Sequence, residues 1–286
     1  MKIIKKHFST ILIFLFLGLG LSLLLYPTIS DYWNSFHQTK AIADYTQAVE
    51  NLDKEDYEKL WKEAEEYNRK LLLKGNRWKL SQTERKEYEK LLDVGSRGII
   101  GSVEVPKIDV NLPIYHGVEE TILQIAIGHI EGSSLPVGGK STHCVLSGHR
   151  GLPSAKLFTD LDQLEEGDIF ILHVLDRTLT YEVDQIRIVE PDNMSELDIQ
   201  EGRDLCTLVT CTPYGVNSHR LLVRGHRIAN LKGNEIGMAD AMQIDPMLAA
   251  AVIAACILIC FGVWVFVHTR TSKRTGKRSK GKGEER

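Results

Sequence analysis

The stretch Thr207-Leu208-Val209-Thr210-Cys211-Thr212-Pro213-Tyr214-Gly215-Val216-Asn217-Ser218-His219-Arg220 passes from β-favouring residues into a turn-rich segment, and a second apolar run begins at Leu221. This order predicts a strand, a long turn and a returning strand. Cys211 then lies at the rim of a sheet, and the turn brings Arg220 back beside it. A cation fixed beside a thiol stabilises the thiolate, which is the nucleophilic form. The alternative is a buried, unreactive cysteine, the usual state of a lone Cys, and this stretch alone does not separate the two.

A second predicted strand ends in a histidine. The apolar run Cys144-Val145-Leu146-Ser147 leads through Gly148 into His149, and the turn-rich segment Arg150-Gly151-Leu152-Pro153 follows. His149 therefore also lies where a strand gives way to a loop. A thiolate that attacks a carbonyl and an imidazolium that protonates the leaving amine are the pair that nucleophilic acyl transfer needs. Most other histidines in the middle of the chain are expected to be surface or packing residues.

Both strands belong to a series of short β-type runs within residues 95–230. Many short strands without alternating long helices predict a mixed or antiparallel barrel. Gly138-Gly139-Lys140-Ser141 resembles the end of a phosphate-binding loop, but that loop also needs a glycine where Ser134 stands, so the segment is predicted to be a turn. The predicted strands are Ile99 to Val105, Leu112 to Tyr115, Cys144 to Ser147, Ile169 to Val174, Leu179 to Val189, Leu205 to Thr210 and Leu221 to Ile228.

Composition limits the classes of function. The chain has 286 residues and a formal net charge of −3, so it lacks the basic excess typical of nucleic-acid-binding proteins. About 220 residues remain between two apolar ends, which is enough for one core. No CxxC spacing occurs, so a structural zinc site is disfavoured, and we expect no metal and no cofactor. The five cysteines are Cys144, Cys206, Cys211, Cys256 and Cys260.

Apolar segments near both ends predict membrane spans. Residues 8–26 form an uncharged run preceded by three lysines, and 247–267 form a second run, followed by a basic tail over 268–286. Each run can cross roughly 30 Å of hydrocarbon as a helix. The first is longer than the apolar core of a signal sequence and no clear cleavage site follows, so an uncleaved anchor is favoured. Positive residues flank the outer end of both runs, so residues 1–7 and the tail are predicted to be cytoplasmic, the middle extracellular, and 231–246 a linker.

Residues 27–94 are predicted to form a helical arm that packs against the barrel. From about Ile42 the chain is rich in charge, with apolar residues at helical spacing. Lys74-Gly75-Asn76 breaks this pattern, and Ser81 offers an N-cap for a second helix that runs to Leu92. A coiled-coil partner surface is the alternative, but the heptads are too few. The residues that share one face of the first helix are Leu60, Trp61, Ala64, Tyr67 and Leu71.

Several motifs together resemble one protein family. Thr207-Leu208-Val209-Thr210-Cys211 resembles the Thr-Leu-x-Thr-Cys signature of sortases, and Ser147-Gly148-His149-Arg150-Gly151 resembles the sortase histidine segment. The similarity covers roughly Gly95 to Ile228, and the two predicted anchors fit the class C, pilin-polymerising branch. The further motifs similar to that branch are Cys211-Thr212-Pro213-Tyr214, Asn217 to Arg227, Val105-Pro106-Lys107-Ile108, Leu112-Pro113-Ile114-Tyr115 and Gly138 to His143.

The resemblance implies a sortase-type closed β-barrel and a membrane-anchored cysteine transpeptidase. By that analogy Cys211 attacks the Thr–Gly bond of an LPXTG-like sorting signal, His149 is the general acid and base, and Arg220 positions the substrate and supports the oxyanion. A lysine amine of another pilin subunit then resolves the thioacyl intermediate. Arginine suits this role because it stays charged and offers a rigid fork of donors. Arg224 shares the strand face and is the rival, but Arg220 is nearer the sheet rim and matches the family position.

One departure from the family concerns a lid. Many class C members carry an Asp-Pro-aromatic motif whose side chains cover the catalytic groups, and residues 74–95 contain no Asp-Pro. Trp78, preceded by Arg77, is the candidate to plug the site, and simple packing of Trp78 in the arm is an equal alternative. The resemblance also places Cys144 and Cys206 on neighbouring parallel strands. Such strands rarely give good disulfide geometry, so two buried reduced thiols are favoured over a disulfide.

Three alternatives to pilus polymerisation remain open from the sequence. A sortase that anchors surface proteins to peptidoglycan would use the same residues with a different amine. A non-catalytic, membrane-tethered assembly scaffold would not need Cys211. A secreted Cys–His peptidase would release a free acid even when amines are abundant.

Overall fold

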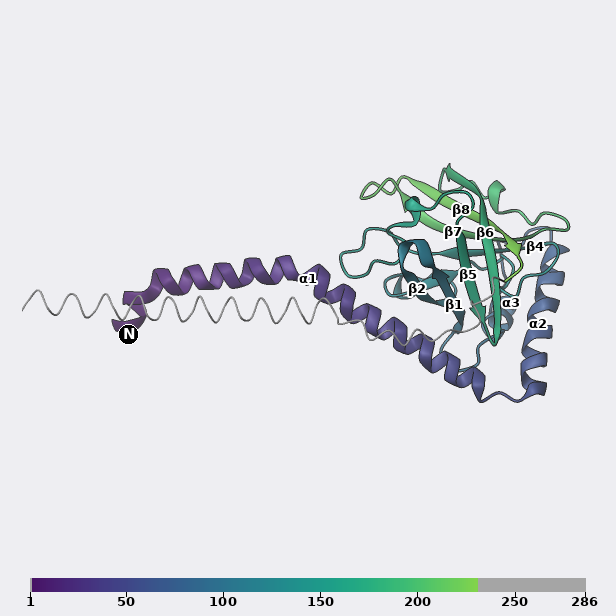
Figure 1. Cartoon of the computed structure of the whole chain (residues 1–286), viewed down its shortest axis with the longest axis horizontal. Helices are drawn as coiled ribbons and strands as arrows, with labels where there is room; N and C mark the ends of the chain where they lie inside the picture. Colours follow the sequence, from purple (N-terminus) through teal and green to yellow (C-terminus); the bar gives the residue numbers. More distant parts are fainter. Residues whose placement is uncertain (1, 231–286) are drawn as a thin grey trace, which may run out of the picture. The chain divides into compact units, whose positions relative to one another are not determined.

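The computed structural model describes residues 2–230, with side chains from residue 12 onward except that of residue 14. The chain divides into two units, and the second, Met238–Arg286, lies outside the described residues, as do the predicted linker over 231–246, the second span over 247–267 and the basic tail. The described part consists of three N-terminal helices followed by a β-barrel (Figure 1). The predicted fold class, mostly β with a helical arm, is confirmed.

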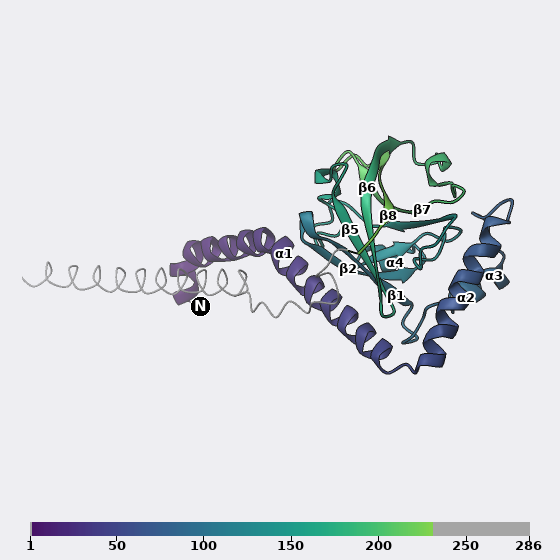
Figure 2. The ribbon, with the colours of Figure 1, turned by 45° about the vertical axis from the view of Figure 1, so that its right-hand side comes forward.

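The barrel is closed, with the strand order β1-β2-β3-β4-β7-β8-β6-β5 (Figures 1 and 2). Two neighbouring pairs, β2 with β3 and β4 with β7, are parallel, and the other pairs are antiparallel. Closure leaves no sheet edge exposed, and side chains of alternating residues fill the interior. The strands are β1 (Ile99–Val105), β2 (Val110–His116), β3 (Ile127–His129), β4 (Thr142–Ser147), β5 (Ile169–Val174), β6 (Arg177–Val189), β7 (Asp204–Thr212) and β8 (His219–Ile228).

Every predicted strand is present, but the prediction missed β3. Its three residues, Ile127–His129, are too few to show an alternating pattern, and they are a strand because they lie between β2 and β4 and bond to both. Short helical turns connect the strands elsewhere: α4 (Glu120–Leu123), η1 (Pro106–Ile108), η2 (Leu161–Gln163) and η3 (Ser195–Leu197).

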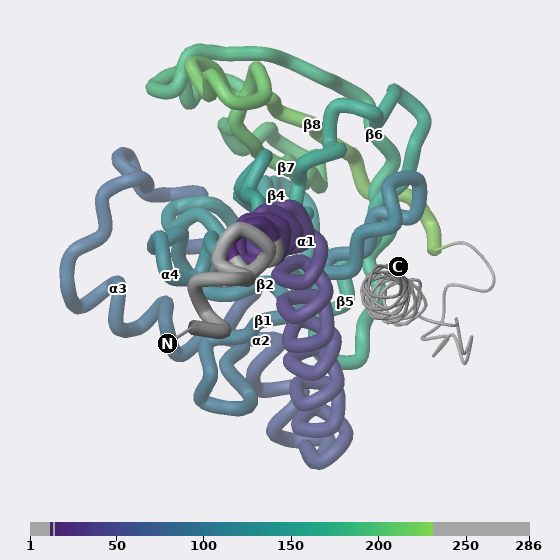
Figure 3. Tube along the Cα trace, turned by 90° about the vertical axis from the view of Figure 1, so that its left-hand side faces the viewer, coloured from purple at the N-terminus to yellow at the C-terminus, as the bar shows by residue number. Residues whose placement is uncertain are grey.

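The arm begins with one long helix, α1 (Lys2–Glu50), that joins the predicted anchor to the barrel. Among the described residues, α1 is the one helix long and apolar enough to cross a bilayer. Beyond Pro27 it continues along β1 and β2 (Figures 2 and 3). Asp31 Oδ1 accepts a hydrogen bond from the Lys156 backbone N–H at 2.7 Å, and the Asn34 side chain donates to the Ser154 carbonyl at 2.8 Å.

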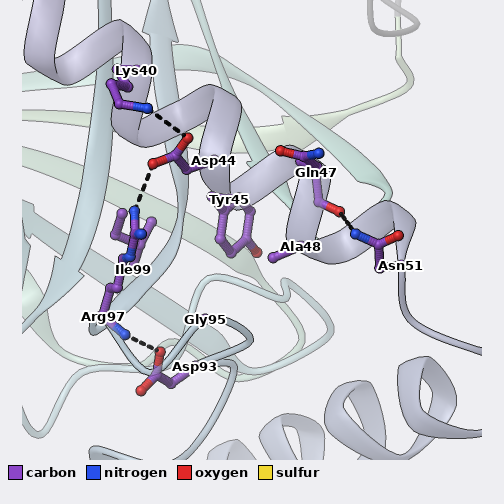
Figure 4. A pocket seen from close by; sticks show the side chains of 10 residues that line it. All are labelled: Lys40, Asp44, Tyr45, Gln47, Ala48, Asn51, Asp93, Gly95, Arg97 and Ile99. Carbon is purple, nitrogen blue, oxygen red and sulfur yellow. Dashed lines mark hydrogen bonds and ion pairs between the residues drawn. The ribbon is translucent and has the colours of Figure 1, made fainter.

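A polar cavity of about 470 Å³ lies between the end of α1 and the segment that leads into β1 (Figure 4). Asp44 bonds both Lys40 and Arg97 there, at 3.2 and 2.6 Å. Tyr45, buried beside it, donates its hydroxyl proton to the Ile100 carbonyl and accepts the Leu175 N–H. One phenol thus joins α1 to β1 and to the β5–β6 turn.

The Tyr45→Phe variant should lower the free energy of unfolding by about 1–3 kcal/mol, because it leaves a buried N–H and a buried carbonyl unpaired. Urea denaturation of the full chain in detergent measures this change. Thr39→Ala is the control, since the Thr39 hydroxyl is exposed and bonds only within α1 in the described part of the chain. Equal stability of both variants would contradict this role of Tyr45.

The helix α2 (Lys54–Leu72) packs one face against the barrel core, as its spacing predicts. Trp61, Ala64 and Leu71 are buried, and Leu60 and Tyr67 pack beside them. The sequence does not predict a role for Asn68 of α2. Its side-chain amide donates a hydrogen bond to the Leu135 carbonyl and accepts one from the Leu135 N–H. This two-way bond ties α2 to the connection between β3 and β4.

The next helix, α3 (Gln82–Tyr88), begins at the predicted cap but ends earlier than predicted. Ser81 and Glu84 form a reciprocal capping box. Tyr88 is fully buried, and its hydroxyl bonds His129 Nδ1 at 2.7 Å. After Tyr88 the chain continues in tight turns, in which the Lys90 and Leu91 N–H groups bond to carbonyls three residues back, and Leu92 with its positive φ of 63° cannot extend the helix.

Two buried histidines should make the fold sensitive to acid. Burial lowers the pKa of both His116 and His143 to about 4. An unfolded chain binds these protons near pH 6.5, so the native state is favoured fully above that pH and loses stability as the pH falls from about 6.5 to about 4. Each histidine can contribute as much as about 3 kcal/mol across that window.

Urea unfolding at pH 7, 5.5 and 4.5 measures this loss. Replacing His116 with Asn should flatten the pH dependence even if it lowers stability at pH 7, whereas His37→Gln, on the exposed side of α1, should leave the slope unchanged. An unchanged slope in the His116 variant would show that other groups cause acid unfolding.

Candidate active site

The predicted nucleophile, Cys211, lies at the end of β7 as a free, half-buried thiol. Its partner across the β7–β8 pair is Arg220. Directly opposite residues of an antiparallel pair project their side chains to the same face of the sheet, so the thiol and the guanidinium lie on one face. The long turn between the two strands gives this register, as the sequence predicts.

His149 reaches the same end of the barrel through the parallel pair of β4 and β7. Register pairs Ser147 with Val209, and beyond it the Gly148 N–H donates to the Val209 carbonyl at 3.0 Å. The buried Thr210 hydroxyl then donates to the Gly148 carbonyl at 2.8 Å. His149 follows Gly148 directly, and Cys211 follows Thr210 directly. The backbones of His149, Cys211 and Arg220, the three predicted catalytic residues, therefore lie at the same end of the barrel.

Gly148 and Thr210 fix this approach, and the sequence analysis did not single them out. A Cβ on Gly148 would lie 2.5 Å from Ile127 Cδ1 and 2.7 Å from Phe158 Cδ2, so only glycine lets the strand end pass over this part of the core. The sequence indicates both residues only through their positions, since Gly148 directly precedes His149 and Thr210 directly precedes Cys211.

Strand alternation directs the side chains of Cys211 and Arg220 to the outside of the barrel. Along β7, Cys206 and Leu208 belong to the main core, whereas Val209 belongs to a second cluster on the opposite face. Cys211 shares the face of Val209, and Arg220 shares the face of its neighbour Leu222. The outer cluster, as we call it, consists of Val145, Leu197, Val209 and Leu222, with Trp78, Ile130, Val189 and Met194 packed against it.

The imidazole of His149 is mostly buried and faces a carboxylate. His149 Nε2 lies 3.4 Å from Glu120 Oε2, and Glu120 begins α4. The side chain of Gln124 bonds the other carboxylate oxygen, and this bond together with the nearby imidazole lowers the pKa of Glu120. Glu120 was not predicted from the sequence, where it is one of two adjacent glutamates before a short apolar run.

Arg220 and its rival Arg224 differ in what holds them. Arg224 is buried and donates from Nε to Asp184 Oδ1 at 2.8 Å, and Asp184 also binds Arg203. Arg220 instead donates from Nη1 to the carbonyls of Asn217 and His219, at 3.3 and 3.1 Å. Arg224 is thus part of an ion-pair network farther along the strand, whereas Arg220 lies opposite the thiol.

The candidate lid residues contact the outer cluster and the connection between β6 and β7. Arg77 is buried, and its guanidinium donates to the Leu197 carbonyl at 2.8 Å and to Asp198 Oδ1 at 3.0 Å. It also stacks 4.1 Å from the ring centre of Trp78, which packs on the outer cluster. Among the described residues, the hydrogen bonds of Arg77 reach this connection and Gly132, and none reaches the three catalytic candidates.

Cys144 and Cys206 are partners across the parallel β4–β7 pair, and both are buried free thiols. Burial raises the pKa of the Cys206 thiol well above its ordinary value. Both thiols are enclosed in the core, where a substrate carbonyl does not reach them, so these side chains are core residues. The other two cysteines, Cys256 and Cys260, lie outside the described residues. In the described part of the chain, no group of three or more His, Cys, Asp or Glu side chains is arranged to hold a metal ion.

Comparison with known proteins agrees with this geometry. Residues 103–228 match the sortase domain. The chain is 32% identical to sortase D of Bacillus subtilis over 131 residues, which is 45% of this chain and 63% of that protein. Against sortase A of Streptococcus agalactiae the identity is 31%, over 40% of this chain and 47% of that protein. This chain therefore spans about half to two thirds of these two relatives.

Solved structures give a fuller match. Sortase C1 of Streptococcus agalactiae is 52% identical, with a TM-score of 0.66, and the match covers 67% of this chain and 100% of that one. Sortase C of Streptococcus pneumoniae, whose structure bears on pilin substrate specificity, is 47% identical, with a TM-score of 0.61 and coverage of 67% and 97%. The chain belongs to the sortase family, in the class C branch that its motifs resemble.

Proposed function

We propose that this protein is a pilin-polymerising cysteine transpeptidase. Cys211 attacks the carbonyl carbon of threonine in an LPXTG-like sorting signal, and His149 gives a proton to the leaving glycine amine, so that the Thr–Gly bond breaks and a thioester forms. A lysine amine of another pilin then attacks the thioester, His149 takes up its proton, and the thiolate leaves. No cofactor enters either step. The observation that carries the proposal is the register that aligns His149, Cys211 and Arg220 at one strand end.

Arg220 is the oxyanion donor in this mechanism. Within the described residues, the hydrogen bonds of Arg220 are donated by Nη1. Its Nε and Nη2 can therefore donate to the developing oxyanion. Donors held in place before the reaction stabilise the transition state more than water does. The outer cluster is the proposed binding surface for the apolar residues of the signal, because its members Val209 and Leu222 lie two residues from Cys211 on β7 and from Arg220 on β8.

The same proposal includes the membrane topology. The sequence predicts two spans, over 8–26 and 247–267, with both termini cytoplasmic and the barrel over 95–230 extracellular, in contact with membrane lipid through both spans. The continuity of α1 from the apolar run to the barrel supports an uncleaved first anchor. An extracellular barrel reaches exported pilins, and an acceptor lysine on a second pilin gives a covalent polymer.

The experiment incubates the full chain in detergent with a sorting-signal peptide and detects the thioester by mass spectrometry. We expect an adduct on Cys211 that disappears when an amine is added. With pilin subunits alone as donor and acceptor, covalent ladders should form. Transfer only to a peptidoglycan amine would favour cell-wall anchoring, accumulation of free acid despite added amine would favour a peptidase, and no adduct would favour a scaffold.

We also propose that residues 74–81 act as a lid over the outer cluster, with Arg77 as the latch and Trp78 as the plug. The Arg77→Ala variant should raise kcat/KM for the peptide by at least about fivefold, because its ion pair with the exposed Asp198 alone is worth about 1 kcal/mol and the hydrogen bonds to two backbone carbonyls are lost with it. Initial rates of transfer measure the effect. Lys79→Ala, exposed in the same segment, is the matched control. A decrease in the Arg77 variant would mean that the segment helps to bind substrate.

A further inference from the structure

The carboxylate beside His149 has no part in the mechanism described so far. Glu120 Oε2 is the side-chain group that bonds the imidazole within the described residues, at 3.4 Å from Nε2. This distance is long for a charge-assisted hydrogen bond, as is common for catalytic contacts before substrate binds. Gln124 Nε2, one turn along the chain, donates to Oε1 of the same carboxylate.

The barrel itself places Glu120 at this point. The helix α4, which begins with Glu120, leads into β3, and β3 pairs with β4 through Gly128 and Ser147. Ser147 lies two residues before His149, so the backbones that carry the carboxylate and the imidazole are joined by sheet hydrogen bonds. Gln124 then restrains the side chain from one side, leaving Oε2 directed at the histidine.

We propose that Glu120 is a positioning residue for His149: its carboxylate accepts the Nε2–H, so that Nδ1 is the nitrogen that gives and takes the proton in each acyl-transfer step. This inference rests on the proposed transpeptidase function. An imidazole has two nitrogens, and the partner of one decides which tautomer the neutral ring adopts. A base oriented by a third group is a recurring arrangement in nucleophilic catalysis.

A purely structural surface contact would behave differently. Glu120 keeps 68% of its side chain exposed, and exposed ion pairs contribute little to stability. Loss of the carboxylate should therefore leave the melting temperature unchanged and act on the chemical step. Because the hydrogen bonds of the carboxylate within the described residues go to His149 and Gln124, the binding of the peptide should also be unaffected.

The test compares Glu120→Leu, which removes charge and acceptor, with Glu120→Gln, which keeps an acceptor oxygen. Glu119→Leu is the matched control, since Glu119 is the adjacent, exposed glutamate and caps nothing with its side chain. We expect Glu120→Leu to lower kcat about tenfold with KM within twofold, Glu120→Gln to recover part of that loss, and Glu119→Leu to match the wild type. Melting temperatures should agree within the error of measurement.

Nitrogen-15 NMR of the labelled full chain in detergent gives a readout independent of activity. With the His149 signals assigned by their absence in His149→Asn, the neutral ring should carry its proton on Nε2 in the wild type and populate both tautomers in Glu120→Leu. An unchanged tautomer and kcat in Glu120→Leu, or a change in KM alone, would overturn the proposal. If the wild type itself forms no thioester, the proposed function fails, whereas the tautomer measurement still decides the role of Glu120.

Discussion

The Cys211→Ala variant should form no thioester and transfer no peptide, a loss of at least about 10⁴-fold in kcat, because removal of a catalytic nucleophile leaves only binding and oxyanion stabilisation. The fold should survive the change, since the Cys211 side chain is half-exposed near the end of β7 and is not a member of the main core. Mass spectrometry of the peptide adduct and initial rates of transfer give the two readouts.

A thioester on one of the two buried cysteines, Cys144 or Cys206, would contradict that prediction. Cys144 and Cys206 lie on the same two strands, five residues before His149 and Cys211. Cys206→Ala should therefore still form the thioester, although a small cavity in the core will lower its melting temperature. An adduct that persists in Cys211→Ala and maps to either buried cysteine would refute the assignment of the nucleophile.

The second large effect is expected at Arg220. Replacing it with Ala should lower kcat/KM by about 10²–10³-fold, the usual cost of losing an oxyanion donor. Lys at this position should recover only part of the rate, because it keeps the charge but loses the planar fork of donors. Single-turnover measurement of thioester formation isolates this step from the later transfer to the amine.

Arg224 provides the contrast that makes the result specific. It is bonded to Asp184, so Arg224→Gln should lower the free energy of unfolding yet leave kcat/KM of the folded enzyme within about threefold. If Arg224→Gln instead reproduced the loss seen in Arg220→Ala, the oxyanion role would belong to Arg224.

The sequence was most informative where local chemistry decides the structure. Two motifs, around His149 and Cys211, end strands that the barrel sets side by side, and turn residues between Cys211 and Arg220 fix the register of the hairpin. The helix cap at Ser81 was likewise readable, because side chain and backbone satisfy each other within one turn.

Features decided by distant contacts were not readable from the sequence. Ile127–His129 is a strand only because β2 and β4 flank it, and Glu120 meets His149 only through that strand. Arg77 resembles any surface cation of a charged arm, yet it is buried because two backbone carbonyls and Asp198 of other segments converge on it. In each case the deciding partner lies more than ten residues away along the chain.

In the proposed membrane topology, the hydrogen bonds between α1 and the loop after His149 set the distance between the bilayer and the barrel. With residues 8–26 in the bilayer, Asp31 follows the span by five residues, a rise of about 7.5 Å in a helix, and it is bonded to Lys156. In that topology a short helical segment, and no flexible linker, connects the bilayer to the side of the barrel that carries His149. Under the proposed pilin-polymerising function, each new subunit would then be added close to the membrane surface, and the polymer would grow from its base.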